Sequence, residues 1–251
     1  MKVKYIIDRV LARLGWNMRL ERIKKLPLEV EKRFRGQAEE MIRQCGEFVV
    51  IEEFRDDSQA HPVHYRTYEC EFASEQITLI KPGEILDVGS YRDWLAGVMA
   101  HYLVTTVDVR DRSSNLSNEN IVNQDVRSLE LEDNSIDMVT TLHTIEHFGL
   151  GRYGDEFDPD GDRKAISNFL RVIKPGGYFL FSVPVTAGDP CIAFNSHRIY
   201  TMEMVRGWVR ELSLEGEVFI KRKPAKLCNE SELAIELGEF DIYCGCYIKK
   251  K

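Results

Sequence analysis

The chain has 251 residues, of which 43% are apolar and 30% are charged, as in an ordinary globular protein. Its formal net charge of −7 disfavours a nucleic-acid-binding protein, which needs basic residues to neutralise phosphates. No apolar run approaches the roughly 20 residues of a membrane-spanning helix. The six cysteines include no C-x-x-C pair, so we expect reduced thiols, a cytoplasmic protein and no bound metal.

The N-terminal third is predicted to be mainly helical. Apolar spacing predicts one helix over Ile6–Leu14, and a second is expected over Leu28–Cys45. Residues 46–68 are mixed and polar, which predicts a loop with short elements. Residues 75–80 are expected to end a third helix, at a Lys-Pro-Gly turn.

The first 25 residues differ from the rest in charge. They contain eight basic and two acidic residues, so they carry +6 while the remainder carries −13. Their apolar positions Ile6, Val10 and Leu14 would form a stripe along a helix. We expect this stripe either to pack on the domain or to lie on an anionic membrane surface.

From residue 84 onward, short apolar strands alternate with helical stretches, a pattern typical of a parallel sheet with crossover helices. The predicted strands are Glu84–Val88, Val104–Asp108, Met138–Leu142 with a lead-in from Ile136, and Tyr178–Val183. The predicted helices are Trp94–His101, Arg163–Ile173 and Thr201–Leu212, the last with its N-cap at Thr201. A closing antiparallel pair is expected from Val218–Arg222 and Ile242–Lys249.

Acidic residues mark the ends of these strands. The first strand leads into Asp87-Val88-Gly89-Ser90, which places an acid and a bare backbone at the edge where α/β proteins bind ligands. The second ends at Asp108, whose carboxylate can accept hydrogen bonds from both ribose hydroxyls of an adenosine. A carboxylate at Asp125 could take the adenine amino group. The absence of G-x-G-x-x-G argues against a nicotinamide cofactor.

The order of these blocks, with Leu142–His147 and the turn at Lys174–Gly177, resembles class I S-adenosylmethionine-dependent methyltransferases over about residues 80–220. The resemblance implies a doubly wound, seven-stranded, mostly parallel α/β sheet with an N-terminal helical extension. Residues 75–251 would form this domain, and residues 1–74 a helical segment that covers the cofactor site. A narrower resemblance, through Gly149–Asp155 and Asp158–Asp162, is to an uncharacterised bacterial family found with surface-polysaccharide genes.

The resemblance also implies which residues bind the cofactor, S-adenosylmethionine. By position these residues are Asp87, Gly89 and Ser90 beside the methionine moiety, Asp108 at the ribose, Asp125 at the adenine, and Leu142 and His143 beneath the sulfonium. The family usually has glycines where this chain has Tyr91 and Asp93. Side chains there would crowd the cofactor or line the pocket in another way. A catalytically inactive binding or scaffolding protein is therefore the competing prediction.

Methyl transfer to a hydroxyl needs an aligned acceptor and is helped by a general base. The predicted catalytic residues are His147, Glu146 and His197, and the expected acceptor is a saccharide or other small polar molecule, methylated on oxygen. Alternatively, Glu146 and His147 brace the junction between the fourth strand and the next helix. Arg198, near His197, is expected to meet either an acidic substrate or a structural carboxylate.

Two metal-based alternatives remain open at this point. His143-x-x-Glu146-His147 matches an inverted zinc-protease motif, which would make the protein a hydrolase, but that motif must lie on one helix. Asp155, Asp158, Asp160 and Asp162 could hold a divalent cation that binds a sugar diol, or form a solvated loop with Asp caps.

Overall fold

The computed structural model describes residues 27–44, 63–112 and 116–251. The chain divides into two compact units, residues 1–61 and residues 62–251. Within the first unit, helix α2 (Leu28–Gln44) confirms the second predicted helix; acidic residues in its first turn and Arg43 in its last favour the helix dipole. The helix predicted over Ile6–Leu14 lies outside the described residues.

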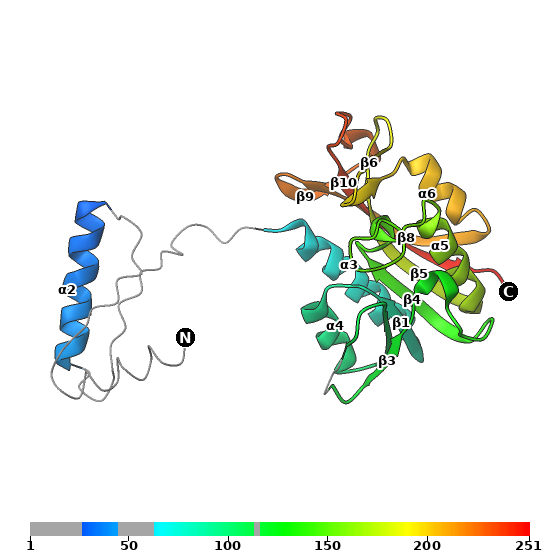
Figure 1. The fold of residues 1–251 in the computed structure, drawn as a ribbon, viewed down its shortest axis with the longest axis horizontal. Coiled ribbons are helices and arrows are strands. Elements are labelled where there is room, and N and C mark those ends of the chain that lie inside the picture. The colour runs from blue at the N-terminus through cyan, green and yellow to red at the C-terminus, as the bar shows by residue number, and fades with distance from the viewer. Residues whose placement is uncertain (1–26, 45–62, 113–115) are drawn as a thin grey trace. The chain divides into compact units, whose positions relative to one another are not determined.

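The second unit is built on an eight-stranded sheet with the strand order β3-β2-β1-β4-β5-β10-β8-β9 (Figure 1). The strands are β1 (Glu84–Val88), β2 (Leu103–Asp108), β3 (Glu119–Asn123), β4 (Ile136–Leu142), β5 (Ile173–Val185), β8 (Leu212–Arg222), β9 (Ala225–Cys228) and β10 (Asp241–Lys249). The first five run parallel, whereas β10 is antiparallel to both β5 and β8. The predicted fold class and closing antiparallel pair are confirmed; β9, folded back on β8, is the strand beyond the predicted seven.

Helices cover both faces of this sheet, as a doubly wound fold requires. On one face, α3 (Tyr65–Ile80) and α4 (Arg92–Met99) contribute Phe72, Ile77 and Leu95 to a core with Ile85 and Met138. On the other face, α5 (Gly161–Val172) and α6 (Met202–Trp208) pack against the aromatic side chains of β5. This burial from both sides explains why the central strands read as apolar runs.

Helix α3 begins earlier than the sequence pattern indicates. Residues 65–68 were expected in a loop, but the helix starts at Tyr65, where the His64 side chain accepts a hydrogen bond from the Arg66 amide at 3.2 Å. The helix also spans the predicted boundary between residues 74 and 75. Its buried stripe contains Glu69 together with Phe72, and this buried acid obscures the apolar periodicity.

Two short elements follow the carboxyl ends of β4 and β5. The 3-10 turn η2 (Ile145–His147) follows β4, and a hairpin of β6 (Cys191–Ala193) and β7 (His197–Ile199) follows β5. Arg198 ties the hairpin to the loop after η2, because its guanidinium donates to the Phe148 and Pro159 carbonyls at 2.7 and 3.1 Å. The following helix α6 has the predicted Thr201 N-cap, which accepts from the Met204 amide, but it ends at Trp208 rather than Leu212.

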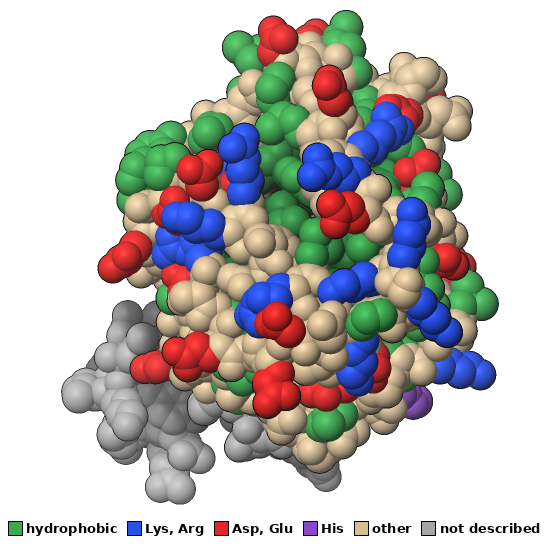
Figure 2. Space-filling model, turned by 90° about the vertical axis from the view of Figure 1, so that its right-hand side faces the viewer, with side chains coloured by type: hydrophobic (Ala, Val, Ile, Leu, Met, Phe, Trp, Pro, Cys, Tyr) green, Lys and Arg blue, Asp and Glu red, His purple; other side chains and the backbone are tan. Residues whose placement is uncertain are grey.

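Charged side chains of both signs lie on the face shown in Figure 2. On the face shown in Figure 2, Lys and Arg side chains are interspersed with Asp and Glu and do not form one continuous basic area. In the described part of the chain, every helix is too short or too polar to cross a membrane.

Candidate active site

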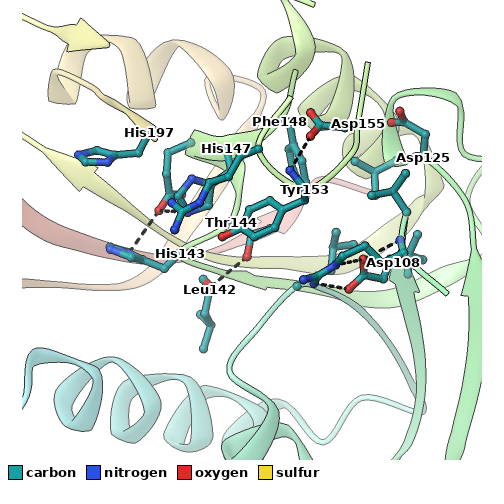
Figure 3. Close-up of a pocket in the computed structure, with 18 of the residues that line it drawn as sticks. Asp108, Asp125, Leu142, His143, Thr144, His147, Phe148, Tyr153, Asp155 and His197 are labelled. Carbon is teal, nitrogen blue, oxygen red and sulfur yellow. Dashed lines mark hydrogen bonds and ion pairs between the residues drawn. The ribbon is translucent and has the colours of Figure 1, made fainter. Parts of the chain in front are cut away.

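A cavity of about 400 Å³ opens at the carboxyl ends of the parallel strands (Figure 3). This size is within the usual range for small-molecule sites. Residues from four strand ends line it: Val88 and Gly89 at the end of β1, Asp108 at the end of β2, Asp125 after β3, and Leu142, His143, Glu146 and His147 at and after the end of β4. Residues distant in sequence therefore meet at one edge of the sheet, as predicted for α/β folds.

The turn after β1 requires glycine. Gly89 has a φ of +72°, and a Cβ atom there would lie 2.5 Å from the Thr144 methyl group. Any other residue would therefore combine a strained backbone with a steric clash. This close approach brings the β1 turn against the β4 turn and shapes the floor of the cavity.

Asp87 and Ser90, both predicted to bind the cofactor, lie beneath the cavity and do not line it. The Asp87 carboxylate accepts from the Ser90 amide at 3.2 Å and from the Thr140 hydroxyl at 2.7 Å. Ser90 Oγ in turn accepts from the Leu142 amide at 3.1 Å. Burial raises the pKa of Asp87 to about 6. These two residues join the turns after β1 and β4, so their contribution to the site is positional.

Tyr91 and Asp93 are also outside the cavity lining. The Tyr91 hydroxyl donates to Asp93 at 2.8 Å, and the ring is 44% exposed. The Arg66 guanidinium lies over this ring, 5.3 Å from its centre. The side chains that replace the expected glycines therefore point away from the space that they were expected to crowd.

Asp108 reaches the cavity, but its carboxylate is already bonded. It accepts from the Arg110 amide at 3.0 Å, from Arg110 Nε at 2.9 Å and Nη2 at 2.7 Å, and from Arg112 Nη2 at 2.9 Å. Burial alone would raise its pKa, but these arginine contacts hold the pKa of Asp108 below its usual value. All four lone-pair directions of the carboxylate are thus in use.

Asp125 has a similar arrangement with Arg127. It caps η1 (Val126–Ser128) by accepting from the Arg127 amide at 2.9 Å, and the Arg127 guanidinium bonds both carboxylate oxygens. The hydrogen bonds from Arg127 lower the pKa of Asp125. Asp108 and Asp125, which were predicted to face one ligand, both lie at the cavity as salt-bridged acids.

His143, Glu146 and Glu69 form a buried cluster at the inner end of the cavity. His143 Nδ1 lies 3.7 Å from Glu69 Oε1 and 3.8 Å from Glu146 Oε1. Among the described residues, neither His143 Nδ1 nor Glu146 Oε2 has a hydrogen-bond partner. Burial lowers the pKa of His143 to about 3 and raises that of Glu146 to about 8 and of Glu69 to about 7. The imidazole and the Glu146 carboxyl are therefore uncharged at neutral pH.

His147 and His197, predicted from sequence as catalytic, meet at Ser196. His147 Nδ1 lies 2.6 Å from the Ser196 carbonyl oxygen, which can only accept, so Nδ1 carries the proton and Nε2 is unprotonated. His197 Nδ1 lies 2.8 Å from the Ser196 hydroxyl. Burial lowers the pKa of His147 to about 4 and also lowers that of His197. Glu146 Oε1 is 3.7 Å from His147 Nε2, so the structure brings the three predicted catalytic residues together.

Several lining residues were not predicted. Tyr65 and Arg66 come from α3, and Phe240 comes from the segment before β10. Glu69, also from α3, lies behind the lining residue His143. The spacing of Glu69 with Phe72 and Ile77 on one helical face was the available signal for a buried acid. The Tyr153 ring lies 5.1 Å from the guanidinium group of its neighbour Arg152 and 4.9 Å from that of Arg110, which only the fold brings to it.

The acidic loop after η2 uses its carboxylates internally. Asp155 accepts from the Gly149 amide at 2.7 Å and the Tyr153 amide at 3.2 Å, whereas Asp158 pairs with Lys164 at 2.7 Å. The described residues contain no group of three side chains arranged to hold a metal ion. His143 precedes η2, so the three residues of the zinc-protease motif do not share a helix.

Comparisons with known proteins identify the fold. A family model described as a Caenorhabditis protein of unknown function, DUF268, matches residues 89–210, whereas no curated protein sequence matches the chain. Among solved structures, the [4+2]-cyclase SpnF has a TM-score of 0.55 at 16% identity, covering 74% of this chain and 80% of its own.

Two methyltransferase structures with bound S-adenosylhomocysteine are also similar. The 1,6-didemethyltoxoflavin-N1-methyltransferase of Burkholderia thailandensis has a TM-score of 0.54 at 15% identity, covering 92% of this chain and 94% of its own. The N-methyltransferase NodS of Bradyrhizobium japonicum WM9 has a TM-score of 0.52 at 13% identity, covering 74% and 87%. At these identities the similarity shows a shared fold, the Rossmann-like α/β sheet found in these methyltransferases.

Proposed function

We propose that this chain is an S-adenosylmethionine-dependent methyltransferase that methylates an oxygen of a saccharide or other small polar acceptor. The convergence of Gly89, Asp108, Asp125 and the Leu142–His143 strand end on one cavity carries this proposal. Two similar structures that hold S-adenosylhomocysteine support it at the level of the fold. The cytoplasm and surface-polysaccharide biosynthesis are the proposed setting, from the reduced cysteines and the narrower sequence resemblance.

The chemistry of the lining fits this cofactor. Val109 and Val126 supply apolar surface for a purine, and the carboxylates beside them can accept from ribose hydroxyls and an amino group. Arg66 lines the other end, near Gly89, and pairs with no acid in the described part of the chain, so it is suited to an amino-acid carboxylate. The obstacle is that arginines occupy both acids, Arg110 on Asp108 and Arg127 on Asp125.

The bound cofactor supplies an electrophilic methyl group. Asp108 and Asp125 would hold the adenosine, and His143 and Leu142 would form the wall next to the reacting groups. His147 is oriented by the Ser196 carbonyl, so its Nε2 lone pair can accept the acceptor hydroxyl proton. Glu146 is uncharged at neutral pH, so it places no negative charge next to that nitrogen.

One observation favours a second candidate, a binding or scaffolding protein without catalysis. The Asp108 carboxylate is saturated by arginine, so no free acceptor faces a ribose in this conformation. The SpnF cyclase also shows that a similar fold serves another chemistry.

A thermal-shift measurement with S-adenosylmethionine and S-adenosylhomocysteine tests the proposal. A ligand present at 100 times its dissociation constant adds about 2.7 kcal/mol to the free energy of unfolding, which gives a clear shift. Stabilisation by both ligands, with none from NAD, is the expected result. No shift with either one would favour the scaffolding alternative.

A further inference from the structure

An arginine lies in the part of the cavity next to the proposed catalytic residues. Arg152 lies in the loop after η2 and lines the cavity beside His147 and His197. Among the described residues it forms no ion pair with a carboxylate. Arg110 and Arg127, which also line the cavity, are instead paired with Asp108 and Asp125.

Four aspartates of the same loop and the first turn of α5 have partners other than Arg152. Asp155 is bonded by backbone amides, Asp158 by Lys164 and Asp160 by Arg163, while Asp162 accepts from the Tyr200 hydroxyl at 2.9 Å. Glu146, an acid in the cavity wall, is protonated at neutral pH because burial raises its pKa to about 8. These acids therefore form no ion pair with the Arg152 guanidinium in the part of the chain that the structure describes.

Two contacts hold this guanidinium in place. Its Nη1 donates to the Ser196 carbonyl at 3.2 Å, and its plane lies over the Tyr153 ring at 5.1 Å. The same carbonyl accepts from His147 Nδ1, so the guanidinium is fixed next to the proposed base. One of five N–H donors is used in this contact, which leaves others for a ligand.

We infer that Arg152 binds an anionic group of the acceptor, so that the substrate is an acidic saccharide whose reacting hydroxyl lies at His147. A guanidinium group favours carboxylates and phosphates because its planar donors match two oxygens at once. The neutral inner wall at His143 and Glu146 accommodates the uncharged hydroxyl end, and Arg152 the charged end. This inference rests on the proposed function and specifies its acceptor class.

Calorimetric titration with three sugars that share one ring tests the inference: D-glucose, D-glucuronate and D-glucose 6-phosphate. We expect at least one anionic sugar to bind about tenfold more tightly than glucose, the effect of one charge-assisted hydrogen bond. Arg152→Gln should remove that gain. Arg163→Gln, in the same loop but paired with Asp160, should retain it.

Equal affinity for glucose and both anions, or no measurable binding of the anions, would overturn the inference, as would a gain that survives in Arg152→Gln. Comparison of the two anionic sugars shows whether carboxylate or phosphate is the preferred group. Titrations with and without S-adenosylhomocysteine separate the two proposals. If that ligand does not bind, the proposed function fails, while the preference for anions is still measured.

Discussion

Replacing Arg110 with alanine is expected to strengthen the binding of S-adenosylhomocysteine. The Arg110 side chain contributes two of the four hydrogen bonds that saturate Asp108, and a ribose diol would need those same two positions. In the wild-type protein, the ligand must therefore displace the guanidinium group. In the variant, each carboxylate oxygen regains one position that can accept from the ribose, while the residue 110 amide and Arg112 keep the other two.

The size of the effect follows from the exposure of the ion pair. The Arg110 side chain is 54% exposed, and exposed ion pairs contribute about 0–1 kcal/mol. Removing the competitor should therefore lower the dissociation constant by up to about fivefold. Asp108→Ala should act in the opposite direction. Loss of the ribose acceptors costs about 1.5–3 kcal/mol, which raises the dissociation constant roughly 10- to 150-fold.

Isothermal titration calorimetry of S-adenosylhomocysteine into the three proteins measures both effects. Arg206→Ala is a matched control, because Arg206 is 53% exposed and pairs with Glu230 outside this cavity. Weaker binding by Arg110→Ala would mean that Arg110 contacts the ligand, and unchanged binding would mean that it does not compete. Either result would exclude competition between Arg110 and the ribose for Asp108, and an unchanged dissociation constant in Asp108→Ala would refute the ribose assignment.

Four other predictions concern the rest of the chain. Gly89→Ala should lower the free energy of unfolding, measured by urea denaturation, by at least about 1–2 kcal/mol, because φ is +72° and Thr144 leaves no room for a Cβ atom. Gly207→Ala, where a Cβ atom would meet open space, should not lower it, and equal stabilities of the two variants would contradict this prediction. Glu146 has a pKa of about 8 when folded and 4.5 otherwise, so its contribution to stability is complete below pH 4.5 and is lost as the pH rises through about 8. Thermal melts of Glu146→Gln should thus decline less over this range than those of the wild type, and parallel curves would argue against a buried neutral acid. His147→Ala or His197→Ala should reduce the rate of methyl transfer about 100-fold or more without changing the affinity for S-adenosylhomocysteine. Turnover that survives both changes but is abolished by a chelator would instead indicate a metal at Asp155–Asp162. If residues 1–25 bind membranes, the full chain should co-sediment with anionic liposomes at low salt but not at high salt, and deletion of the segment should abolish this binding. The absence of binding at low salt would exclude the membrane-surface prediction and favour the alternative, packing on the domain.

Structural features that depend on neighbouring residues could be predicted from the sequence. The apolar runs that end at Asp87 and Asp108 predicted strands and the edge at which they meet, because strand period and parallel topology fix both. Gly89 was likewise identified as a position of bare backbone. The helical placement of Glu69 was missed, because an acid within an apolar stripe resembles a loop residue until its partner is known.

The remaining features depend on contacts between distant segments. The apolar pattern of the helix does not indicate what Glu69 contacts. Its carboxylate accepts a hydrogen bond from the Ser182 hydroxyl, which is 113 residues away in sequence. Tyr153 is placed between Arg110 and Arg152 only after the loop folds over the cavity. The saturation of Asp108 is a matter of side-chain conformation, which the spacing of acids and arginines does not specify.

A crystal structure of the protein with S-adenosylhomocysteine would show whether the cavity binds this ligand. We predict that the ligand occupies the cavity at the ends of β1, β2 and β4, with its ribose on Asp108, its purine between Val109 and Val126, and Arg110 displaced from the carboxylate. A structure in which Arg110 remains on Asp108 and the ligand is absent, or bound elsewhere, would contradict it.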